Sequence, residues 1–234
     1  DEAKMSHVGA RNVNHVVGTV TYMGSVSHFS ARFPRTSIAD DPVLRAANEA
    51  ILEIGLGRLT LAEVARRAGV SRMTVYRRYE GLDRLVSALL VVEFSAVIAE
   101  AAERARSETT ARGRIVREVV HVTRRTAEHP LMRRILELDP EMLMPLVVDR
   151  LGSSHRMGLE RLRVLIAAGH DDGSVAAGDV DAMSLQVLSM AAIHVFSARA
   201  YDSVDPRGRR WPEMERALHG YLRPEVLPTA AGRP

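Results

Sequence analysis

Residues 59–79 constrain the fold of this chain more than any other stretch, because they predict two short helices joined by a tight turn. Thr60 and Glu63 have the spacing of a capping box, in which each side chain satisfies a free backbone N–H at the start of a helix. Apolar residues then recur at helical spacing over residues 61–68, and Gly69 supplies the left-handed conformation that ends a helix. The chain must turn at this glycine.

The second helix of this stretch is predicted to begin after Ser71, whose hydroxyl is a good N-cap. Its inward residues would be Val75 and Tyr79. Its outward face would carry Arg72, Met73, Tyr76 and Arg77. Guanidinium, hydroxyl and phenol groups on one exposed helix can contact the phosphates and base edges of DNA.

The same stretch resembles the helix-turn-helix of TetR-family transcriptional regulators, which show the pattern T-x-x-x-[IVL]-A-x-x-[AL]-G-V-[ST]-x-x-[TA]-[LVF]-Y. The matching residues are Thr60, Val64, Ala65, Ala68, Gly69, Val70, Ser71, Thr74, Val75 and Tyr76. The alternative is a helical hairpin buried in a larger bundle. The crowding of arginines around the turn argues against it, since charged side chains are rarely buried without partners.

The resemblance implies specific DNA contacts. We expect base-edge contacts from Arg72, Thr74, Tyr76 and Arg77, and phosphate contacts from Thr60, Ser71 and Arg78. Met73 is expected to touch a thymine methyl group or nothing, and the alternative for Tyr76 is packing against a neighbouring helix. Many family members carry a polar residue near the start of the fourth helix, where this chain has Leu82, so Arg78 or Arg84 would have to supply that contact.

Composition predicts an all-α fold. The 234 residues are 46% apolar, enough for a sizeable core in one or two domains, and only 4% aromatic. No run of alternating Val, Ile and Thr long enough for a sheet follows Pro42. Cysteine is absent, which excludes disulfides, thiol nucleophiles and thiolate metal sites and fits a reducing cytoplasm.

Positive charge is concentrated in the helix-turn-helix region. The net charge is only +3, but residues 58–84 contain seven arginines against Glu63, Glu80 and Asp83. Such a patch attracts the phosphate backbone of DNA without regard to sequence.

We expect four segments. Residues 1–39 lack helical periodicity and are predicted to be a disordered tail, although Arg32 and Arg35 could act as an arm in the minor groove. Residues 40–86 would form a three-helix DNA-binding domain, and residues 87–224 a helical-bundle regulatory and dimerisation domain. Residues 225–234 would be a second tail. No secretion signal is recognisable, so a cytoplasmic location is expected.

Helix boundaries are predicted from caps, prolines and glycines. Asp41 and Pro42 begin the first helix, and a long helix follows Gly81. Later helices are expected at 112–128, 131–138, 153–168, 179–199 and 211–222. Residues 182–198 carry no charged side chain and are apolar on every face, which predicts burial on all sides.

Burial of that helix on all sides predicts a dimer contact rather than a membrane span, because the uncharged stretch is short and contains several polar residues. The resemblance implies a homodimer through about 179–222. Two identical DNA-binding units related by a twofold axis would read an inverted repeat in double-stranded DNA. The resemblance further implies that the protein is a repressor and that a small-molecule effector releases it from DNA, as is usual in this family.

The effector site is the least defined prediction. Methionines suit an adaptable apolar pocket for a hydrophobic effector, and ordinary core packing is the alternative reading of each. The candidates are Met132, Met144, Met157 and Met190, with His194. No metal site or cofactor is expected, since no histidine has a metal-binding spacing. An effector-free architectural DNA-binding protein is a second hypothesis, and a helical-bundle enzyme, for which no catalytic motif is present, is a remote third.

Overall fold

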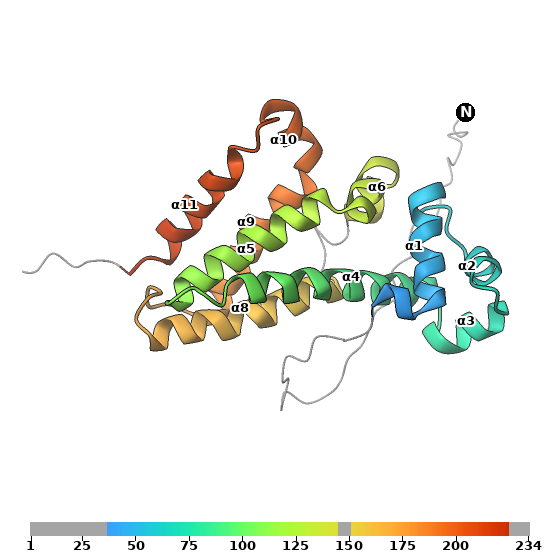
Figure 1. Cartoon of the computed structure of the whole chain (residues 1–234), viewed down its shortest axis with the longest axis horizontal. Helices are drawn as coiled ribbons and strands as arrows, with labels where there is room; N and C mark the ends of the chain where they lie inside the picture. The colour runs from blue at the N-terminus through green and yellow to red at the C-terminus, as the bar shows by residue number, and fades with distance from the viewer. Residues whose placement is uncertain (1–36, 145–150, 225–234) are drawn as a thin grey trace, which may run out of the picture.

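The computed structural model describes residues 37–144 and 151–224, and every regular element within these ranges is helical. The all-α prediction is therefore confirmed for the described part of the chain. The predicted tails at 1–39 and 225–234 lie almost wholly outside it. Figure 1 shows α1, α2 and α3 at one end of an elongated molecule, from which α4 runs into a bundle of longer helices.

The helices follow one another with short connections. Their bounds are η1 Ile38–Asp40, α1 Pro42–Ile54, α2 Leu61–Ala68, α3 Arg72–Tyr79, α4 Leu82–Arg104, α5 Ala111–Glu128, α6 Pro130–Leu138, η2 Pro140–Met142, α8 Ser153–Asp171, α9 Val180–Phe196, α10 Ala198–Val204 and α11 Arg210–Leu222.

The N-terminal helices α1–α3 form a head whose first helix begins at a buried cap. The carboxylate of Asp41 accepts hydrogen bonds from the backbone N–H groups of Val43 (2.9 Å) and Leu44 (3.3 Å), and Pro42 occupies the first helical position. At the other end, Gly55 adopts a φ of 86°, which favours glycine and ends α1.

The core of the head continues into the rest of the chain. One hydrophobic cluster joins buried residues of α1–α4 with Leu131, Met132 and Ile135 of α6. The carboxylate of Asp139, just after α6, accepts a 2.7 Å hydrogen bond from the N–H of Leu56, just after α1. Thus α6 is packed and hydrogen-bonded against the first helix of the head.

A second hydrophobic cluster holds α5, α8, α9 and α11 together. The same helices are also joined by a partly buried ion pair, in which Arg161 of α8 donates two hydrogen bonds to the buried Glu118 of α5, at 2.9 and 2.6 Å. The bidentate geometry satisfies both carboxylate oxygens, as a buried charge requires.

Three local predictions are corrected. The helix expected at 153–168 continues to Asp171, because Gly169 lies inside it and its lack of a side chain makes room for Val175. The helix expected at 179–199 is two helices, α9 and α10, bent by 68°. Glu63 does not complete a capping box, because its carboxylate binds Arg66 and Arg67 instead.

In the single chain one side of α9 is uncovered, so its predicted burial on all sides would need a partner subunit. Leu185 is 48% exposed and Ile193 is 50% exposed. Within the described residues, α4 is long and apolar enough to span a membrane, and so are α9 and α10 if taken together. In this structure α4 packs against α1, α5 and α8, so its apolar length is explained by its position as a core helix.

Candidate DNA-binding site

The turn between α2 and α3 is built from backbone caps. The Oγ1 atom of Thr60 accepts the N–H of Glu63 (3.1 Å), which begins α2. Gly69 then adopts the left-handed conformation, with φ at 68°, and the N–H of Val70 bonds the carbonyl of Ala65 (3.0 Å). This pair of features is a glycine C-cap, and it directs the chain into α3.

Helix α3 is held by one cap and one buried side chain. The Oγ atom of Ser71 accepts the N–H of Thr74 at 3.0 Å, and Val75 is fully buried in the core of the head. These two anchors fix both the start and the rotation of the helix. The outward face is therefore determined by the sequence of α3 itself.

All the predicted DNA-contacting residues of α3 lie on that outward face. The exposed side chains are Arg72, Met73, Thr74, Tyr76, Arg77 and Arg78. Met73 is 57% exposed and Tyr76 is 53% exposed, an unusual position for large apolar groups. Tyr76 makes no ring contact with another described aromatic residue, and about half of its side chain is exposed.

Some arginines of the head are neutralised by ion pairs, and two on α3 are not. Arg66 and Arg67 bind Glu63, and their hydrogen bonds lower the pKa of its carboxyl to about 2. Arg84 pairs with Glu80 at 2.8 Å. Within the described residues, Arg72 and Arg77 have no acidic partner.

Arg78 is placed differently from what its predicted phosphate contact suggests. Its guanidinium lies 2.5 Å from the carboxylate of Asp41, which is 2% exposed. The same carboxylate oxygen accepts a 2.6 Å hydrogen bond from the hydroxyl of Tyr79. The pKa of Tyr79 is raised above its usual value, mainly by burial and to a smaller extent by this hydrogen bond. Arg78 is thus a surface cation that also holds the end of α3 against the start of α1.

From the sequence Asp41 is predicted only as a helix cap, and its contacts with Arg78 and Tyr79 appear only in the structure. The same is true of the hydrogen bond between Asp139 and Leu56, which secures the connection after α1. These partners are 38 and 83 residues apart, and no local pattern indicates such pairs.

The predicted effector residues are not gathered at one place. Met132 is buried in the first hydrophobic cluster and Met157 packs against it, whereas Met190 packs against the second. Met144 is 52% exposed, and the ring of His194 contacts the rings of Tyr201 and Trp211. Within the described ranges, no cluster of His, Asp and Glu could hold a metal ion.

Comparisons with known proteins agree with this geometry. The family model of bacterial regulatory proteins of the tetR family matches residues 43–89, which span the head and the start of α4. An uncharacterized HTH-type transcriptional regulator of Mycobacterium bovis, Mb2274c, is 32% identical over 180 residues, covering 77% of this chain and 92% of its own. An uncharacterized HTH-type transcriptional regulator of Mycobacterium tuberculosis, Rv2250c, matches to the same extent.

Two solved structures share the fold. The transcriptional regulator FadR from Bacillus subtilis, in complex with stearoyl-CoA, has a TM-score of 0.56 at 15% identity, over 78% of this chain and 96% of that one. A SmeT–triclosan complex has a TM-score of 0.56 at 16% identity, over 82% and 96%. With the matched family model, the close relatives and an exposed α3 on a helix-turn-helix, the chain belongs to the TetR family of transcriptional regulators.

Proposed function

We propose that this regulator is a homodimeric repressor that binds a palindromic operator through α3 and leaves it when a small molecule binds. The observation that carries the proposal is the outward face of α3, where Arg72 and Arg77 are exposed and have no acidic partner among the described residues. Cationic side chains on a rigid helix can enter the major groove without first breaking an ion pair.

Individual contacts follow from the positions of the side chains. Arg72, Thr74, Tyr76 and Arg77 would reach base edges, and Met73 a thymine methyl group. Thr60, Ser71 and Arg78 would hold phosphates. Thr60 uses its oxygen as an acceptor in the cap of α2, so its O–H remains able to donate to a phosphate oxygen.

The proposed dimer uses residues 179–222. Leu185 and Ile193 are exposed on one side of α9, and Tyr221 of α11 is 39% exposed. Exposed apolar residues at helical spacing mark a surface that another chain covers. In this proposal residues 40–86 bind DNA, residues 87–224 provide dimerisation and regulation, and the protein works in the cytoplasm, where its operator is.

The proposed effector is a small hydrophobic molecule. FadR was solved with stearoyl-CoA and SmeT with triclosan, which supports ligand control in proteins of this fold. The residues predicted for its pocket, Met132, Met144, Met157, Met190 and His194, lie apart in this structure and do not line one pocket together. The alternative, an architectural protein without an effector, predicts no ligand-specific rise in melting temperature in a screen of hydrophobic compounds. The enzyme hypothesis is dropped, because the family is one of transcriptional regulators.

The experiment that tests this proposal is the selection of binding sites from a random pool of duplex DNA at one fixed salt concentration. The wild type is compared with Tyr76→Ala and Arg77→Ala, and with Arg106→Ala as a matched control on the exposed connection after α4. We expect an inverted repeat that the control retains and both α3 variants blur. Weak, salt-sensitive binding without an enriched sequence would contradict the proposal.

A further inference from the structure

A cavity of about 520 Å³ is lined by residues of α4, α5 and α11 and by Glu108 of the connection after α4. Figure 1 shows these parts of the three helices at the end of the molecule remote from α3. Its volume is in the range of small-molecule sites. None of the methionines proposed for the apolar pocket lines it.

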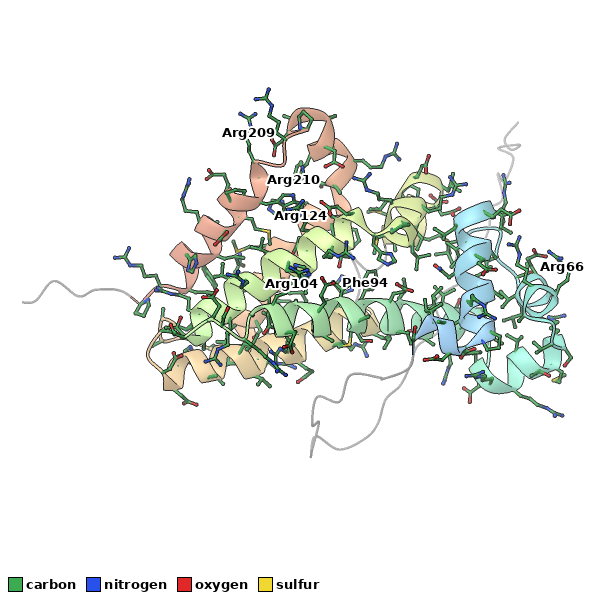
Figure 2. The ribbon with its side chains drawn as sticks, in the orientation of Figure 1. Arg66, Phe94, Arg104, Arg124, Arg209 and Arg210 are labelled. Atoms are coloured by element: carbon green, nitrogen blue, oxygen red, sulfur yellow. The ribbon has the colours of Figure 1, made fainter. Side chains whose placement is uncertain are left out.

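Five side chains that can carry positive charge surround this cavity. Helix α5 contributes Arg117, His121 and Arg124, which lie on one face because they are four and then three residues apart. Arg104 comes from the last turn of α4, and His219 from α11. Figure 2 labels Arg104 and Arg124, which come from the neighbouring helices α4 and α5.

The arginines keep hydrogen-bond donors for a ligand. Arg104 binds Glu100 (3.0 Å) and Arg124 binds Glu128 (3.0 Å), each through Nε alone, and neither of these two carboxylates lines the cavity. A guanidinium has five N–H donors, so the terminal nitrogens of Arg104 and Arg124 remain available.

The third arginine has a partner inside the cavity wall. Arg117 binds Glu108 at 2.7 Å, and the only other acidic residue of the lining is Glu215. Each of the three arginines is therefore already paired with a carboxylate, so an anion in the cavity would be held by their remaining N–H donors and not by an excess of positive charge.

His121 supplies a separate sign of an unfilled site. Its Nε2 atom is buried and has no hydrogen-bond partner among the described residues, although Glu100 lies 3.4 Å away. A buried polar atom without a partner is costly, and a ligand oxygen or hydroxyl could satisfy it. Beside it, Val116 and Val120 provide an apolar part of the lining.

From these observations we propose that the cavity binds an acidic small molecule, an organic phosphate or carboxylate, whose apolar part rests on Val116 and Val120. This inference rests on the proposed function, because it names the chemical class of the effector. It also places the effector in this cavity and not beside the predicted methionines. A bound anion would connect Arg104 of α4 with His219 of α11. It would thereby join the helix that continues into the head to a helix of the proposed dimer contact.

Calorimetric titration at constant ionic strength tests the inference with phenyl phosphate and benzoate, and with uncharged benzamide as the matched neutral probe. Wild type is compared with the double variant Arg117→Gln/Arg124→Gln, with the charge-retaining Arg117→Lys/Arg124→Lys, and with Arg216→Gln on α11, outside the cavity. We expect at least one anion to bind saturably. Its affinity should fall at least tenfold in the Gln pair and stay within threefold in Arg216→Gln.

Absence of saturable binding by both anions, equal binding of benzamide, or undiminished binding by the Gln pair would overturn the inference. Both substituted arginines are more than half exposed, so the fold should be retained, and circular dichroism with the Lys pair checks this. Operator affinity is measured on the same preparations by fluorescence anisotropy. If the protein binds its operator but no anion, this inference alone is wrong. If it binds an anion but no operator sequence, the proposed repressor function is wrong.

Discussion

Tyr79, the last residue of α3, donates a 2.6 Å hydrogen bond from its hydroxyl to the buried carboxylate of Asp41, the residue that caps α1. The carboxylate also accepts two backbone N–H groups and pairs with Arg78. One acidic side chain therefore begins the first helix of the head and holds the end of the helix that faces DNA.

Replacing Tyr79 by Phe removes this hydrogen bond and keeps the ring. We expect the free energy of unfolding to fall by about 1–2 kcal/mol, because the acceptor is charged and buried. Urea denaturation with an unchanged m value is the measurement. Tyr201→Phe is the control, since the hydroxyl of Tyr201 has no hydrogen bond to another described residue. Equal midpoints for Tyr79→Phe and wild type would show that the contact contributes nothing.

The salt dependence of operator binding should distinguish paired from unpaired arginines. Arg77 is proposed to reach a base edge, but it has no acidic partner in the described ranges, so its charge also displaces counterions from the neighbouring phosphates. Arg77→Ala should therefore lower the slope of log K against log salt by up to about 0.9, the value for one neutralised phosphate. Arg66→Ala should change the slope much less, because Glu63 already neutralises that guanidinium. Fluorescence anisotropy across a salt series is the measurement, and equal slopes for the two variants would contradict this account.

The exposed apolar side of α9 predicts the effect of charge on assembly. The double variant Leu185→Glu/Ile193→Glu should be monomeric by light scattering at a concentration where the wild type is dimeric, because both side chains are about half exposed in the single chain. Val164→Glu, on α8 and 58% exposed, should leave the dimer intact. A dimeric double variant would place the interface elsewhere.

Stability should fall in mild acid partly through His155. Burial lowers the pKa of His155, whose ring stacks on Phe196 with 6.2 Å between centroids. The unfolded chain therefore binds a proton more readily than the folded one, so stability is complete above about pH 6.5 and is lost as the pH falls. His155→Phe keeps a ring there and cannot titrate.

Urea midpoints at pH 7.5 and pH 5.5 should consequently differ less for His155→Phe than for the wild type. Some dependence should remain, since burial also lowers the pKa of His121 and of His194. If the two proteins lost the same stability between these pH values, the His155 explanation would be wrong.

What the sequence by itself determined is local. The caps at Asp41, Thr60 and Ser71 and the left-handed Gly69 lie where the pattern predicts them, because a helix start or stop depends on neighbours within about four residues. The outward face of α3 follows from the same periodicity, once Val75 is assigned to the core.

Only the tertiary structure decided which distant groups meet. The hydrogen bond from Leu56 to Asp139 and the grouping of Arg104, Arg117 and His219 around one cavity join residues with no periodic relation. The bend between α9 and α10 is likewise absent from the hydrophobic pattern, which runs through it without a proline or glycine. Such features depend on how whole helices pack, and packing is set by side-chain shape across the bundle rather than by spacing along one helix.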